Sequence, residues 1–236
     1  QTLTEGADPS KGLKILQAMT PFWIEYSLYD ECQRHIYPLL YENTSQVVLT
    51  LRQRMNLSAV AGKASTWAKG PTPETHSAWK TALTIAEKLD DKEIRLQAHY
   101  GLWLYYLRTG ELDKALEHAQ SMCELARSIT DEEAMATGLR ILGVSLHFLG
   151  RHDVGRDYLQ QSLDWYEHGE LSHSFRFGLD QESAGQAFLS RLLWLQGEYK
   201  AAKQMAWRGV KKAARLQHVC SLCCALAEGA CMTAAL

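Results

Sequence analysis

The chain has 236 residues, of which 46% are apolar and 22% charged, and its formal net charge at pH 7 is −2. This length suffices for a sizeable hydrophobic core, and the composition is that of an ordinary water-soluble protein. A net charge near zero, without a basic stripe, argues against direct binding of nucleic acid. No stretch approaches the roughly 18 apolar residues of a membrane-spanning helix, so we expect no contact with a membrane either.

The first residues show no helical pattern. Residues 1–11, QTLTEGADPSK, lack the basic and apolar regions of a secretory signal. We therefore expect a linker or disordered segment there and a cytoplasmic location. The chain lacks an initiator methionine and stops inside an apolar run, which leads us to expect a piece of a longer protein.

From residue 12 onward, pairs of amphipathic helices recur along the chain. In residues 134–150, leucines repeat at helical spacing, and residues 151–166 form a second apolar face after a glycine. Two helices joined by such a short turn form an αα-hairpin, because a helix ends readily on a left-handed residue such as glycine. The turn glycines are 40, 40 and 47 residues apart, at Gly70, Gly110, Gly150 and Gly197. In an earlier, degenerate copy, Ser27 stands near the turn.

A small residue follows each turn glycine at a distance of five positions, where the two helices of a hairpin touch. These residues are Thr75, Ala115, Gly155 and Ala202. The pattern resembles that of tetratricopeptide repeats, with a period nearer 40 residues. Because one hairpin cannot bury its apolar face alone, such hairpins stack into a solenoid.

The sequence therefore predicts an all-α superhelical solenoid of about five tetratricopeptide-like hairpins plus a final unpaired helix, in a single domain over residues 12–236. We expect the superhelix to be right-handed. The unpaired helix leaves an apolar face that terminal repeats normally cover, which favours a homodimer through that end.

Longer phrases resemble one regulator family more closely. They include KGPTPETHSAWKTALTIAEKLDD, RFGLDQESAGQAFLSRLLWLQGEYKAA and SLCCALAEGAC. These phrases are similar to the repeat tail of bacterial regulators that join a winged-helix DNA-binding domain to a signal-transduction ATPase domain. The resemblance implies a sensor region that binds a ligand or partner protein and controls the parent's upstream ATPase domain.

The chain itself shows no signature of either upstream activity. The string Gly62–Lys63–Ala64–Ser65 lacks the first glycine of a phosphate loop and lies within a predicted helix. We therefore expect a non-catalytic domain. The alternative is a free-standing tetratricopeptide adaptor that binds a peptide or partner protein, and a coding region upstream of Gln1 would separate the two.

Two clusters of cysteine and histidine residues raise the question of a metal site. Cys220, Cys223 and Cys224 provide a single C-x-x-C half-site, whereas a structural zinc site normally uses two. Cysteines spaced this way on a helix serve as small buried residues, which we favour. The loop YEHGELSHSFRFGLD contains an H-x-E-x-x-H string, and we interpret it as a solvated loop, with a lip over the binding surface as the alternative.

The binding surface is predicted from the first helix of each hairpin, which lines the concave side of such solenoids. Inward-facing residues recur at fixed distances before each turn glycine: Trp67, Tyr100, Arg108, Arg140, His147, Arg191 and Trp194. Aromatic residues and arginine are enriched in binding hot spots, and arginine suits carboxylate or phosphate. Packing between hairpins is the alternative for the two tryptophans. Because arginines are rarely fully buried, we expect these residues to form a groove. Its ligand would be an acidic or amphipathic protein, peptide or small molecule. We expect no cofactor, no metal and no catalytic residue.

Overall fold

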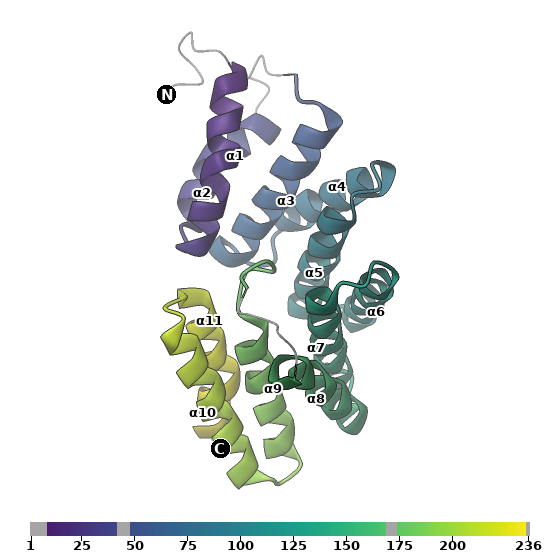
Figure 1. The fold of residues 1–236 in the computed structure, drawn as a ribbon, viewed down its shortest axis with the longest axis vertical. Coiled ribbons are helices and arrows are strands. Elements are labelled where there is room, and N and C mark those ends of the chain that lie inside the picture. The colour runs from purple at the N-terminus through teal and green to yellow at the C-terminus, as the bar shows by residue number, and fades with distance from the viewer. Residues whose placement is uncertain (1–8, 42–47, 169–173, 235–236) are drawn as a thin grey trace. The chain divides into compact units, whose positions relative to one another are not determined.

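The computed structural model describes residues 9–41, 48–168 and 174–234, and all regular structure in these ranges is helical (Figure 1). In chain order the helices are α1 (Pro9–Glu25), α2 (Tyr29–Tyr41), α3 (Leu51–Ala68), α4 (Pro73–Lys88), α5 (Lys92–Thr109), α6 (Leu112–Ser128), α7 (Glu132–Phe148), α8 (His152–His168), α9 (Gln181–Leu195), α10 (Tyr199–Arg215), α11 (Val219–Cys224), the π-helix η1 (Ala225–Cys231) and α12 (Met232–Ala234). The chain forms two compact units, residues 1–105 and 106–236, and the boundary lies within α5.

In the first unit, helix packing is centred on one tryptophan. The Trp79 indole is buried against Gly62 and Gly101, where an added Cβ would lie 2.6 Å and 2.1 Å from the ring. Its N–H donates to Thr66 Oγ1 at 3.0 Å. The two glycines therefore let α3 and α5 pack closely on the tryptophan of α4.

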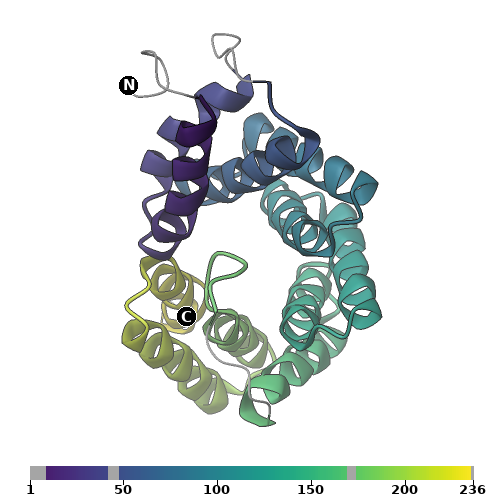
Figure 2. The same ribbon diagram turned by 45° about the horizontal axis from the view of Figure 1, so that its top comes forward.

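In the second unit, α7 packs on α8 and α9 packs on α10 and η1. Figure 2 shows α7 and α9 in one layer of this unit and α8 and α10 in the other. A close backbone approach within a hairpin joins Gly143 of α7 and Gly155 of α8, where an added Cβ would lie 2.7 Å from a backbone oxygen. Gly155 occupies the position at which the repeat pattern predicts a small residue.

The hairpin turns use left-handed residues as the sequence predicts. Gly70, Gly110, Gly150 and Gly197 have φ between 77° and 83°, and Ser27 has φ 57°. No atom lies within 4 Å of a Cβ placed on any of these four glycines, so only backbone conformation requires glycine there.

Three turns that follow the second helix of a hairpin also contain a left-handed residue that is not glycine. Asp90, Thr130 and Gln217 have φ of 53° to 54°. Helices α7 and α9 then begin at aspartate N-caps, where Asp131 and Asp180 accept hydrogen bonds from backbone N–H groups, and these satisfy otherwise unpaired donors of the first turn.

The described helices form five hairpins followed by a final helical run from Val219 to Ala234, which confirms the predicted all-α repeat solenoid. Helix α1 begins at Pro9, slightly before the predicted start of the repeats, and residues 1–8 lie outside the described ranges. The single-domain boundary at residue 12 stays a prediction. The final run departs from a plain α-helix, because its middle turn is a π-helix.

Candidate functional site

The seven predicted site residues lie in very different surroundings. Tyr100, Arg140 and His147 are buried, Trp67, Arg191 and Trp194 are half-buried, and Arg108 is exposed. All seven lie on the first helices of their hairpins, as predicted. Only part of the set therefore offers accessible atoms to a ligand.

Arg140 contradicts the expectation that it is accessible, since it is only 1% exposed. Its Nε and Nη2 groups donate to Gln181 Oε1 at 3.0 Å and 2.7 Å. Gln181 Nε2 in turn donates to the carbonyl of Leu179 at 2.8 Å. The guanidinium therefore joins α7 to the start of α9, and a buried charge held this way contributes mainly to structure.

Arg191 of α9 is the more accessible arginine, with 17% of its side chain exposed. It forms an ion pair with Glu228 of η1. Its guanidinium carbon lies 5.4 Å from the Phe148 ring and 5.7 Å from the Phe188 ring. Both distances are in the range of cation–π contacts. Arg191, Glu228, Phe148 and Phe188 are called the Arg191 cluster below.

His147 adjoins this cluster and is buried at the end of α7. Its Nδ1 lies 3.1 Å from Nδ1 of His152, across the hairpin turn. Burial, the positive charge of Arg191 and the neighbouring His152 lower the pKa of His147 to about 4. The imidazole is thus neutral at physiological pH, when one of the two facing nitrogens donates and the other accepts.

Arg108 and Arg140 act on the same group of the final helical run. Burial raises the pKa of the Cys224 thiol to about 11, against the smaller, opposing effects of Arg140 and Arg108. Glu228 adds a negative charge beside them. Arg108 of α5, Arg140 of α7 and Glu228 of η1 therefore lie close enough to Cys224 to affect its pKa, and Glu228 also pairs with Arg191 of α9.

The aromatic members of the predicted set pack within their own hairpins. The Trp194 ring lies 4.7 Å from the Tyr199 ring and 5.8 Å from Lys203 Nζ. Tyr100 is buried, with its ring 5.4 Å from that of Trp103. These contacts of Trp194 lie within its hairpin, so they do not bear out packing between hairpins, whereas Tyr100 is buried and offers no groove surface.

The loop before α9 is not solvated in its described part, so the favoured interpretation is wrong for residues 174–180. Phe177 and Leu179 are 2% and 4% exposed, and the Phe175 ring stacks 4.0 Å from the His218 ring. Arg176 donates to Asp131 Oδ1 and Oδ2 at 3.1 Å and 2.8 Å. This segment ties together the N-terminal ends of α7, α9 and α11. The Glu170 and His173 positions of the H-x-E-x-x-H string lie outside the described residues.

The cysteine cluster does not converge on a metal site. Across residues 9–41, 48–168 and 174–234, no three His, Cys, Asp or Glu side chains gather as metal ligands. Cys220 and Cys224 are only half-buried, so the expectation of buried cysteines is not met. The pKa of Cys224 is raised to about 11, which disfavours the thiolate that zinc binds. Cys223 is exposed instead.

Sequence reasoning missed the partners that fix the arginines. Gln181 lies 41 residues beyond Arg140, and Glu228 lies 37 residues beyond Arg191. No local spacing signals such pairs, because the repeats bring them together only on folding.

A membrane-spanning helix would have to be longer and more apolar than any helix in the described ranges.

Comparison with known proteins identifies the fold. No family model matches the chain, and no curated protein matches it. Among solved structures, a Rap protein complexed with competence and sporulation factor has a TM-score of 0.73 and 16% identity, over 89% of this chain and 56% of that one. A signal transduction ATPase with numerous domains and a tetratricopeptide repeat sensor, from Pyrococcus horikoshii, has a TM-score of 0.63 and 14% identity, over 95% of this chain and 34% of that one.

A kinesin light chain with nearly identical tetratricopeptide-like repeats, from Podospora anserina, has a TM-score of 0.60 and 14% identity, over 89% of this chain and 98% of that one. The chain spans about half the length of the Rap protein and about a third of the ATPase. At these identities the likeness shows the fold alone. The chain has the fold of tetratricopeptide-like repeat solenoids.

Proposed function

We propose that this chain is a non-catalytic sensor and interaction domain, which binds an acidic ligand on the first helices of its second unit. As in the Pyrococcus ATPase, where a repeat sensor accompanies an ATPase, the domain reports binding to an ATPase of the same bacterial transcriptional regulator. The ligand class is a peptide or an unstructured protein segment.

The observation that carries this proposal is the gathering of Arg108, Arg140 and Arg191 on one side of the second unit. Arg108 is exposed and Arg191 is partly exposed, so both can meet an anionic group from outside. Arg140 is buried and bonded to Gln181, and with Arg108 it affects the pKa of Cys224. Phe148, 40% exposed beside Arg191, adds an apolar contact. Arginine and aromatic groups together are typical of binding hot spots.

A free-standing adaptor is the second candidate, and the Rap protein supports it, because a chain of this fold is complexed there with competence and sporulation factor. Both candidates use the same binding surface. The coding sequence upstream of Gln1 separates them, since only the sensor role requires an ATPase domain there.

Binding is tested by fluorescence anisotropy with labelled acidic, neutral and basic peptides of equal length. We expect the acidic peptides to bind most tightly. The variant Arg108→Ala plus Arg191→Ala lowers their affinity at least about tenfold, because each lost charge-assisted contact contributes on the order of 1.5 kcal/mol.

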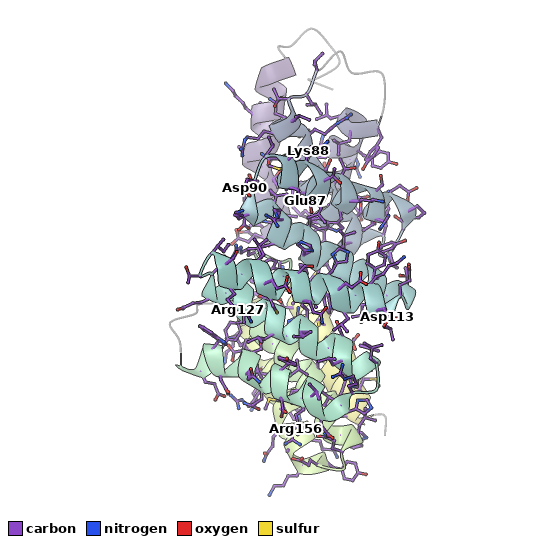
Figure 3. The ribbon with its side chains drawn as sticks, turned by 90° about the vertical axis from the view of Figure 1, so that its right-hand side faces the viewer. Glu87, Lys88, Asp90, Asp113, Arg127 and Arg156 are labelled. Carbon is purple, nitrogen blue, oxygen red and sulfur yellow. The ribbon has the colours of Figure 1, made fainter. Side chains whose placement is uncertain are left out.

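The matched control, Lys114→Ala plus Arg127→Ala, removes two cations from α6, which is the second helix of its hairpin. Figure 3 shows Arg127 at one end of α6 and Asp113 at the other. Because both variants change the net charge equally, a purely long-range effect would weaken binding in both. Equal affinities for acidic and basic peptides, or equal losses in both variants, would refute the proposal.

A further inference from the structure

Helix α10 presents a basic stripe to solvent. The helix contains six cationic residues and no acidic one: Lys200, Lys203, Arg208, Lys211, Lys212 and Arg215. Arg208 pairs with Glu167 of α8, and Lys212 with Glu182 of α9. Within the described ranges, the other four form no ion pair.

Two of those cations, Lys203 and Lys211, lie beside one exposed aromatic residue. Trp207 is 60% exposed, and it lines an open depression of about 590 Å³ together with Lys203, Gln204, Arg208 and Lys211. An apolar ring rimmed by charges is typical of a surface that associates with another molecule. Lys200, Lys203, Trp207, Lys211 and Arg215 are called the basic stripe below.

The neighbouring second helix, α8, carries the opposite charge. Its acidic stripe consists of Asp153, Asp157, Asp164 and Glu167, spaced so that they lie along one face. Asp153, Asp157 and Glu167 are exposed and Asp164 is half-buried. The Arg208–Glu167 ion pair, with Nη2 and Oε1 2.7 Å apart, shows that α8 and α10 are neighbours in the second unit.

The two stripes are in register with the repeat. The turn glycines Gly150 and Gly197 are 47 residues apart (197 − 150), and the same offset separates Asp153 from Lys200 and Asp164 from Lys211. Asp153 and Asp164 thus occupy positions in their hairpin that bases occupy in the next, whereas Asp157 and Glu167 correspond to Gln204 and Ala214. Consecutive helices of equivalent position run in the same direction in a repeat solenoid.

We infer that the second helices α8 and α10 form a self-complementary interface that binds a second copy of this chain. A two-fold axis that runs between the two helices and parallel to them places α10 of one copy on α8 of the other. Lys200 then faces Asp153 of the second copy, and the same contact recurs on the other side of the axis, as an isologous dimer requires. Lys211 faces Asp164 of the second copy in the same way.

The acidic stripe distinguishes a second copy from other occupants. An anionic membrane or nucleic acid on the basic stripe would also meet the carboxylates of α8 and be repelled by them. A second copy satisfies both stripes at once. Helices of 17 residues are about 25 Å long and about 10 Å wide, so two of them cover about 500 Å² per copy. A total near 1,000 Å² is at the small end of specific interfaces, so the dimer is weak and salt-dependent.

The test is a charge swap on the 236-residue chain, followed by sedimentation equilibrium at low and high salt. One variant reverses the acids, as Asp153→Lys plus Asp164→Lys, and the other reverses the bases, as Lys200→Asp plus Lys211→Asp. Each variant alone places like charges at both proposed contacts, 153 with 200 and 164 with 211, so its dimer dissociation constant rises at least about tenfold over the wild-type value at low salt.

An equimolar mixture of the two variants restores association, because each stripe of one variant then faces the opposite charge on the other. A control with the same charge change on another second helix, Asp113→Lys plus Glu117→Lys in α6, dimerises as the wild type does. Circular dichroism confirms that each variant is folded.

A wild-type chain that stays monomeric at low salt would overturn the inference, as would variants that do not recover association on mixing. If the monomer instead binds polyglutamate through the basic stripe, the partner is another acidic protein and the second copy is excluded. The variant Arg108→Ala plus Arg191→Ala leaves the basic stripe intact, so it distinguishes acidic peptides that bind at the first helices from those that bind at the stripe.

Discussion

The spacing of Arg140 in the sequence predicts a place on the binding surface, but in the folded chain its side chain is buried. Its two hydrogen bonds to one amide oxygen of Gln181 join α7 to α9, and the Tyr166 and Cys224 side chains lie within range of its charge. A guanidinium in this position fixes the spacing between two first helices. Its contribution to ligand binding is therefore indirect.

Replacement of Arg140 by alanine is expected to lower the free energy of unfolding by about 3 kcal/mol, because it removes buried hydrogen bonds and leaves the Gln181 amide oxygen unsatisfied. Urea unfolding measures this change. Arg191→Ala, at a half-buried site, is expected to cost less than about 1 kcal/mol. The reverse order would show that Arg140 is not held as described.

His147 makes stability depend on pH. Its pKa is about 4 in the folded chain and about 6.5 in an unfolded one. The unfolded chain therefore takes up the proton first, and stability that is fully present above pH 6.5 is lost as the pH falls toward 4. Between pH 7 and pH 5, protonation of His147 in the unfolded chain alone lowers the free energy of unfolding by about 2 kcal/mol.

The measurement compares urea unfolding of the wild type and of His147→Gln at pH 7 and pH 5. Carboxylates titrate in both proteins, so only the difference between them reports on His147. We expect the variant to lose about 2 kcal/mol less than the wild type over this interval. Parallel losses would mean that the imidazole accepts a proton in the folded state.

At the scale of elements, the packing of α3, α4 and α5 depends on glycines that face an aromatic ring. Gly101→Ala places a methyl group where the Trp79 ring lies, at 2.1 Å from a ring atom. The ring cannot easily move, because its N–H is bonded to Thr66. We expect a loss of about 2 kcal/mol in unfolding free energy.

A double-mutant cycle checks that cause. With Trp79→Leu in the background, Gly101→Ala should cost at least about 1 kcal/mol less, because the clash is gone. Gly110→Ala is the control, since nothing lies near its Cβ and its cost of about 1 kcal/mol comes from the left-handed backbone. An unchanged cost of Gly101→Ala in the Trp79→Leu background would exclude the clash.

The hairpins could be predicted from sequence because their determinants are local. A turn glycine, a small residue five positions later and an apolar stripe lie within one repeat, and even Ser27 takes the left-handed conformation of its glycine counterparts. The left-handed Thr130 and Gln217 have no such signal, since threonine and glutamine rarely adopt this conformation. Residues 174–180 and the π-helix are set by contacts with other repeats.

The candidate site was less predictable for the same reason. First helices were correctly assigned, so all seven residues lie on the expected elements. Whether a side chain on such a helix is accessible depends on the next repeat, about 40 residues away. Arg140 is hydrogen-bonded to Gln181 in the core, whereas Arg191, which pairs with Glu228, stays partly exposed.

At the scale of the whole molecule, a repeat solenoid transmits strain mainly to neighbouring hairpins. Gly101→Ala is therefore expected to speed amide hydrogen exchange in α3, α4 and α5 and to leave α9 and α10 at wild-type rates. Hydrogen exchange with mass spectrometry resolves these segments. Faster exchange throughout the chain would show that all the repeats open as one cooperative unit.

The central claim is that the first helices of the second unit bind an acidic ligand. The most direct measurement is hydrogen exchange of the chain with and without a saturating acidic peptide. The account predicts slower exchange in α7, α9 and η1, around the Arg191 cluster, with unchanged exchange in α6 and α8. Protection confined to the second helices, or no protection at all, would contradict it.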